Sequence, residues 1–120
     1  MDAIRIKRVY MSAEKADGTR ILVDRLWPRG LSREAAAIDM WAKEAAPSAE
    51  LRKWFAHDPE RFKGFAERYR AELDDNSAAR ELSRAVHEMK GTVTLLYGAR
   101  DTNMNNAAGL ADWLKSKEDK

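Results

Sequence analysis

Residues 21–30 of this chain, Ile-Leu-Val-Asp-Arg-Leu-Trp-Pro-Arg-Gly, constrain its fold more than any other stretch. Their apolar, β-branched beginning is typical of a buried strand, yet Asp24 and Arg25 stand side by side near its end. Side chains alternate between the two faces of a strand, so one of these charges goes with the apolar neighbours whichever face is buried. Burying a lone charge is costly, so that charge needs a partner or a ligand. We therefore expect a site at the end of this segment.

Two further stretches read as strands. Residues 4–10 alternate apolar and charged side chains, and residues 92–97 form a short apolar run between Gly91 and Gly98, as expected for a strand covered on both faces. The second strand is predicted over residues 20–27. Its connection from the first strand is short enough for a hairpin, but parallel pairing elsewhere in the sheet is equally compatible with the sequence.

Helices are predicted between and after these strands. Their starts are indicated by Ser48, by Asp58 followed by Pro59, and by Asn76 or Ser77. A closing helix is expected over residues 107–117. Residues 32–46 are ambiguous, and we expect a helical turn followed by a short strand within residues 38–43.

The predicted fold is a single three-layer α/β domain over residues 1–120, with a small, mainly parallel sheet and helices on both faces. A length of 120 residues suits one domain, and a composition of 44% hydrophobic and 35% charged residues suits a folded globular protein. The charged tail from about residue 115 is expected to fray.

Composition also bears on location and chemistry. The chain has no cysteine, which excludes disulfides and thiolate chemistry, and no apolar stretch approaches the roughly 20 residues that span a bilayer. The N-terminus shows no signal-peptide pattern. We expect a cytoplasmic protein with no membrane partner.

Polar side chains gather where two of the predicted strands end. In open α/β sheets, ligands bind beyond the carboxyl ends of parallel strands, and the guanidinium group of arginine suits phosphate or carboxylate. If the two strands run parallel, their ends meet in one pocket. The leading hypothesis is an anion site, for a phosphate ester or another small molecule, with these ligand-binding residues: Asp24, Arg25, Arg29, Tyr97, Arg100, Asp101 and Asn105.

Three other interpretations remain open. The same polar residues also fit a purely structural role, in which they satisfy loop backbone and helix ends. Residues 1–33 hold eight Lys or Arg against four acids, a net charge of +4, while the remainder is −2. This asymmetry permits a nucleic-acid-binding or regulatory module that uses Lys7, Arg8, Arg20 and Arg33. A protein-interaction domain would instead expose a patch of tryptophans.

The sequence shows no pattern for a cofactor or a metal. The six glycines are scattered without phosphate-loop spacing, and two histidines without cysteine make no zinc motif. His57, beside Asp58 and Trp54 at a helix junction, fits a capping or surface role better than that of a catalytic imidazole. No activated nucleophile or acid–base pair is evident, so the sequence leaves open whether the protein is an enzyme, and it does not indicate an oligomeric state.

The order of several motifs resembles a known family, the YeaO-like branch of the domain of unknown function 488 family. The motifs that carry the resemblance are residues 23–30, Trp41 through Pro47-Ser48, residues 51–55, Phe65 through Tyr69 to Leu73, and residues 94–97. The resemblance implies a small bacterial-type cytoplasmic α/β protein with no established activity.

This sequence departs from that family in the loop after the last strand. The family's usual pattern there is Asp-x-x-His-Asn-x-Ala. Asp101 and Asn105 fit it, but Met104 occupies the histidine position. Any role of such a histidine in metal binding or proton transfer does not carry over.

Overall fold

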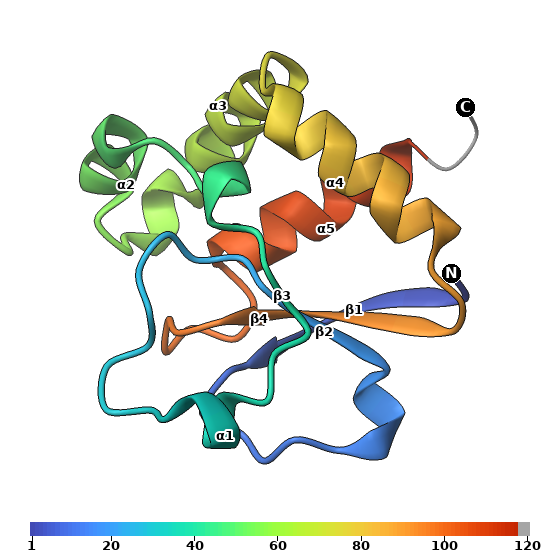
Figure 1. Cartoon of the computed structure of the whole chain (residues 1–120). Helices are drawn as coiled ribbons and strands as arrows, with labels where there is room; N and C mark the ends of the chain where they lie inside the picture. The colour runs from blue at the N-terminus through green and yellow to red at the C-terminus, as the bar shows by residue number, and fades with distance from the viewer. Residues whose placement is uncertain (118–120) are drawn as a thin grey trace.

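The first two strands of the chain do not pair with each other. In the computed structural model, which describes residues 1–117, β1 (Ala3–Arg8) and β2 (Thr19–Leu22) both pair with β4 (Thr92–Tyr97), which lies between them. A short β3 (Met40–Trp41) continues the sheet beyond β2, so the order is β1-β4-β2-β3 (Figure 1). All of these pairs are parallel, and the hairpin alternative is therefore wrong.

β4 is the central strand of the sheet. Residues 93–97 are all buried, and Ile4 lies opposite Val93 on one side while Ile21 lies opposite Leu95 on the other. A strand that is paired on both sides and covered on both faces needs a continuous apolar run. The prediction for residues 92–97 is confirmed.

β2 is shorter than the predicted strand over residues 20–27. It ends at Leu22, and Val23 makes one more bond to the sheet, from its N–H to the Leu96 carbonyl at 3.0 Å. The second half of that prediction is wrong because β3, the outer neighbour, has only two residues and offers no partner further along. The predicted alternation still holds, since Ile21 and Val23 belong to one core cluster and Leu22 to the other.

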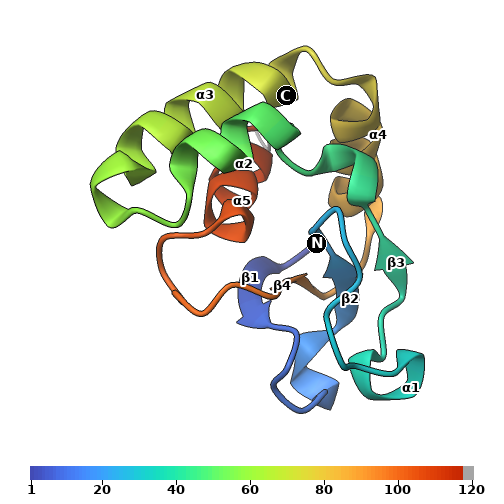
Figure 2. The ribbon, with the colours of Figure 1, turned by 90° about the vertical axis from the view of Figure 1, so that its left-hand side faces the viewer.

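The sheet separates two layers of unequal size, which completes the expected α/β domain. One face is covered by α2 (Ala49–Phe55), α3 (Phe62–Asp74), α4 (Ser77–Glu88) and α5 (Asn106–Ser116). The other face carries only α1 (Arg33–Ala36) and short loops (Figures 1 and 2). The larger core cluster lies under the four helices, and a smaller one lies on the side of α1.

The predicted helix starts are confirmed. The Ser48 hydroxyl accepts the Leu51 N–H at the start of α2, and Asn76 caps α4 in the same way. Asp58 caps a short 3-10 turn that leads into α3. The ambiguous segment 32–46 forms α1 and then β3, as expected.

The end of the chain is only partly described. α5 continues through Ser116, so the first residues of the expected frayed tail are helical, and residues 118–120 lie outside the described part. Within residues 1–117, no helix has both the length and the apolar character needed to cross a membrane.

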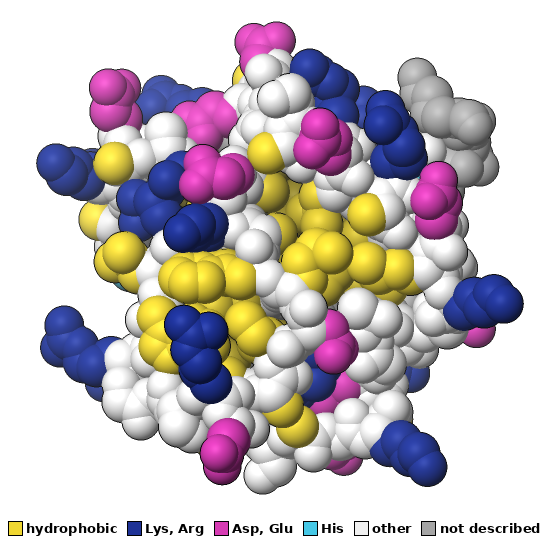
Figure 3. Space-filling model, viewed as in Figure 1, with side chains coloured by type: hydrophobic (Ala, Val, Ile, Leu, Met, Phe, Trp, Pro, Cys, Tyr) yellow, Lys and Arg dark blue, Asp and Glu magenta, His cyan; other side chains and the backbone are white. Residues whose placement is uncertain are grey.

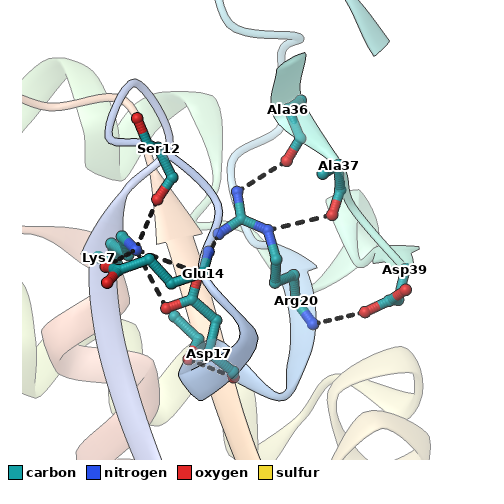
Figure 4. Close-up of polar contacts among 9 residues, drawn as sticks. Lys7, Ser12, Glu14, Asp17, Arg20, Ala36, Ala37 and Asp39 are labelled. Carbon is teal, nitrogen blue, oxygen red and sulfur yellow. Dashed lines mark hydrogen bonds and ion pairs between the residues drawn. The ribbon is translucent and has the colours of Figure 1, made fainter. Parts of the chain in front are cut away.

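The connection from β1 to β2 is held by an internal ion cluster of Lys7, Asp17 and Arg20 (Figure 4). The carboxylate of Asp17 is buried. It forms an ion pair with Nζ of Lys7 at 3.1 Å and another with the Arg20 guanidinium. Arg20 is also buried, and its guanidinium donates to the carbonyls of Ala36 and Ala37. Two of the basic residues considered for nucleic-acid binding therefore hold the second layer against the sheet.

Candidate functional site

A cavity of about 410 Å³ opens at the carboxyl edge of the parallel sheet. The strands point to the left in Figure 1, and Figure 2 views the molecule from that side, with α2 above the sheet edge. The volume lies within the range of small-molecule sites, roughly 300–1,000 Å³. The polar residues that line it are Tyr10, Asp24, Arg25, Arg29, Arg52, His57, Asn105 and Asn106.

Asp24 connects three segments around this cavity. One carboxylate oxygen accepts the N–H of Gly98, just after β4, at 2.8 Å. The other accepts the side-chain amide of Asn106, the first residue of α5, at 3.0 Å. The Asp24 carbonyl accepts the indole N–H of Trp41 at 2.8 Å. The carboxylate of Asp24 thus ties the loop after β2 to the end of β4 and to α5, and its backbone carbonyl ties that loop to β3.

The surroundings of Asp24 raise the pKa of its carboxyl group. Burial is the largest cause, and it outweighs the hydrogen bonds from Asn106 and Gly98 and the influence of the nearby Arg52 and His57 side chains, which act in the opposite direction. A carboxylate with a raised pKa in a cleft is a common feature of functional sites, although buried structural acids share it.

Two further polar contacts hold the loop that follows β2. The Tyr10 hydroxyl donates to the Arg29 carbonyl at 2.9 Å, and the Trp27 indole donates to the Leu31 carbonyl at 2.7 Å. The acceptors in both bonds are backbone carbonyls, so these bonds do not involve the guanidinium groups of Arg25 and Arg29. Within residues 1–117, the side chains of Arg25 and Arg29 make no hydrogen bond or ion pair with the protein.

Arg52 of α2 reaches the cavity from the helical layer. Its Nε atom is buried and has no hydrogen-bond partner within residues 1–117. An unpaired buried donor costs about 1–3 kcal/mol, so native structures rarely leave one without a purpose. Phe55, one turn further along α2, forms an apolar wall beside it together with Phe65 of α3, the two rings stacked at 4.4 Å.

His57 lies at the rim of the cavity on a strained piece of backbone. Ala56 and His57 both have positive φ angles, 47° and 57°, which L-residues adopt at a cost. The left-handed pair turns the chain sharply after α2 and places the His57 ring 5.9 Å from that of Phe55. Strain of this kind is concentrated at functional sites.

The structure brings together four of the seven predicted site residues. Asp24, Arg25, Arg29 and Asn105 line the cavity. Asn105 also caps α5, where its side chain accepts the Ala108 N–H at 2.9 Å.

The other three predicted residues lie outside this lining. Tyr97 is buried in the main core, and Arg100 is exposed. Asp101 is occupied by its own loop, because its carboxylate accepts the N–H groups of Asn103 and Met104, and these bonds lower its pKa. Met104, at the family's histidine position, does not line the cavity either.

Sequence reasoning missed Arg52, and it left His57 and Asn106 out of the predicted site. Arg52 and Phe55 are three residues apart and so share one side of α2. The sequence could have indicated Arg52 as a site residue, because it is a charged side chain on the apolar side of a short helix. His57 carried no such signal, because its position depends on a left-handed turn between non-glycine residues.

The face shown in Figure 3 carries hydrophobic side chains in its middle, between the helical layer and α1, with charged groups around them. The large hydrophobic residues that are exposed within residues 1–117 are Tyr10, Met11 and Leu26. No tryptophan is among them. Trp27 and Trp41 are half-buried and meet edge to face at 5.5 Å, and Trp113 is fully buried.

Comparison with known proteins identifies the family of this chain. A family model described as the inactive DUF488-N3 subclade matches residues 3–120. The chain belongs to this family. The expected membership in the YeaO-like branch of the domain of unknown function 488 family is confirmed by the relatives.

Two uncharacterised relatives illustrate the similarity. The protein YeaO of Escherichia coli K12 is 47% identical over 94% of this chain and 97% of its own. Rv3073c of Mycobacterium tuberculosis H37Rv is 40% identical over 95% of each chain. No solved structure matches.

Proposed function

We propose that this protein is a cytoplasmic binding protein for a small anionic ligand, a phosphate ester, and that the ligand occupies the cavity at the carboxyl edge of the sheet. The observation that carries the proposal is Arg52, a cavity-lining residue whose buried Nε has no hydrogen-bond partner within residues 1–117. A phosphate or carboxylate oxygen is the partner that such a donor fits best.

Two further arginines support an anion at the same place. Arg25 and Arg29 line the cavity from the loop after β2, opposite α2, and their guanidinium groups are not used by the described part of the protein. Cations that approach from two sides raise the local concentration of an anionic ligand. The apolar wall of Phe55 and Phe65 gives room for the carbon part of an ester.

A binding role fits the family better than catalysis does. The matching family is described as inactive. In this chain Met104 replaces the histidine of the usual family pattern, and the described residues that line the cavity include no nucleophile paired with a base.

The basic N-terminal face gives less support to nucleic-acid binding. Lys7 and Arg20 belong to the internal ion cluster, and Arg8 donates to the carbonyls of Ala99 and Gly98 at 2.9 and 3.3 Å. The Arg33 guanidinium lies over the Trp27 ring at 5.4 Å. These side chains serve the fold, and few remain for phosphates of a nucleic acid.

The test is thermal melting and calorimetric titration with inorganic phosphate, sugar phosphates and nucleoside monophosphates. We expect at least one ester to raise the melting temperature of the wild type. The increase should disappear in Arg52→Gln and weaken in Arg25→Ala. Arg70→Gln is the matched control, since Arg70 is exposed on α3 away from the cavity. Equal responses of Arg52→Gln and the wild type would contradict the proposal.

A further inference from the structure

The cavity places an acid among its bases. Asp24 lines the same hollow as Arg25, Arg29 and Arg52. Within residues 1–117 none of the ion pairs includes Asp24, so its negative charge is not taken up by a salt bridge. A carboxylate in this position repels a bare anion, and the repulsion is stronger in a partly buried site than in water. A site that binds only inorganic phosphate would therefore have a higher affinity without the Asp24 carboxylate.

The hydrogen bonds of Asp24 leave acceptor capacity free. Each carboxylate oxygen has room for about two donors. Within residues 1–117, one oxygen accepts a single hydrogen bond, from Gly98, and the other accepts a single one, from Asn106. The remaining lone pairs belong to a residue that lines the cavity, and an ionised carboxylate only accepts. Its complement on a ligand is therefore an O–H or N–H group.

The charge of the surroundings distinguishes between these donors. Three arginines line the cavity, and the positive charge of Arg52 already acts on Asp24. A ligand ammonium group would meet those cations, whereas a neutral hydroxyl would not. A neutral donor satisfies Asp24 without repulsion from the arginines, and a hydroxyl is the neutral donor that phosphate esters of small molecules most commonly carry.

We infer, on the basis of the proposed function, that the ligand is a phosphate ester that carries hydroxyl groups, of the sugar-phosphate or polyol-phosphate class, and that Asp24 is the residue that selects it. The phosphate lies against the arginines, a hydroxyl donates to Asp24, and the carbon chain packs on Phe55. Bare phosphate or sulfate is disfavoured by the same carboxylate.

The experiment compares two ligands that differ only in hydroxyl groups, glycerol 3-phosphate and n-propyl phosphate, with sulfate as the bare anion. Affinities are measured by calorimetry on the wild type, Asp24→Asn and Arg52→Gln. Asparagine keeps an oxygen for the Gly98 N–H but removes the charge. We expect the wild type to prefer glycerol 3-phosphate by about tenfold or more, as is typical of a hydrogen bond to a charged group. In Asp24→Asn the preference should fall severalfold, and sulfate should bind more tightly.

The outcomes separate this inference from the proposed function. Equal affinity of the wild type for the two esters, with loss of both in Arg52→Gln, would overturn the inference and leave the anion site standing. If the wild type binds neither the two esters nor sulfate, both this inference and the proposed function are wrong. The comparison of the two esters uses the wild type alone, so it remains decisive even if Asp24→Asn does not fold.

Discussion

The backbone N–H of Gly98 donates a 2.8 Å hydrogen bond to the carboxylate of Asp24, although 74 residues separate the two. The bond joins the loops that follow β2 and β4, and both residues line the cavity. A Cβ atom at position 98 would lie 3.3 Å from the Asp24 oxygen, so glycine lets the two segments approach without displacing the carboxylate. Asp24 thus links the loop after β2 to the loop after β4 and to α5, in the lining of the cavity.

Asp24 and Asp17 should affect stability with opposite pH dependence. Burial raises the pKa of Asp24 above its ordinary value of 3.8, so the folded state binds the proton more readily. Its ionisation then costs stability as pH rises from 3.8 through the raised value. Asp17 is buried too, but hydrogen bonds from the Glu14 backbone, Lys7 and Arg20 outweigh burial and lower its pKa. The stability that Asp17 provides above 3.8 is lost as pH falls through the lowered value.

Urea unfolding of the wild type, Asp24→Asn and Asp17→Asn between about pH 3 and pH 7 measures this difference. As pH rises, the free energy of unfolding of the wild type should fall relative to Asp24→Asn and increase relative to Asp17→Asn. Curves that run parallel for all three proteins would show that neither carboxyl has a shifted pKa.

Arg52→Met should separate stability from binding. Methionine retains most of the apolar length of arginine. It also removes the buried Nε donor, which has no partner within residues 1–117 and costs the wild type about 1–3 kcal/mol of stability. We expect the free energy of unfolding to stay within about 0.5 kcal/mol of the wild type or to rise, while ligand-induced stabilisation is lost. A large loss of stability would instead assign Arg52 to the structural framework.

Gly18→Ala should be among the most damaging single substitutions. Gly18 has a φ of 65° and a ψ of −132°, a combination that side chains rarely tolerate, and a Cβ atom there would lie 2.0 Å from the Thr92 carbonyl oxygen. We expect a loss of about 3 kcal/mol or more in chemical denaturation.

Gly30→Ala is the matched control for this substitution. Gly30 has a φ of 75°, but a Cβ atom added there would have no neighbouring atom within 4 Å, so only the backbone cost of about 1–2 kcal/mol applies. Equal losses at the two positions would mean that the close approach to Thr92 does not matter.

Ala56→Gly should stabilise the protein. Ala56 ends α2 with a φ of 47°, a conformation that glycine adopts without strain. We expect a gain of about 0.5–1 kcal/mol in the free energy of unfolding. Ala71→Gly, at an exposed position inside α3, should cost about 1 kcal/mol. If Ala56→Gly is destabilising by a similar amount, the left-handed turn is not the resting conformation.

Short-range signals were sufficient for much of this fold. The apolar run of β4 and the caps at Ser48, Asp58 and Asn76 depend on residues within one turn or one strand, so the order of residues along the chain predicts them. The same local reasoning placed Asp24 and Arg25 at the end of an apolar strand, where a partner was required. The motif order, likewise read from the sequence, led to the right family.

Long-range contacts decided the remaining features. The insertion of β4 between β1 and β2, the early end of β2, and the burial of Arg20 all depend on segments that meet only after folding. For the same reason Arg52 joined the site while Arg100 stayed outside it. Local propensity extends over a few residues, whereas pairing and burial free energies are set by whichever distant residues lie opposite. The sequence therefore determined the elements and one charged strand end, and the tertiary structure determined which side chains share the cavity.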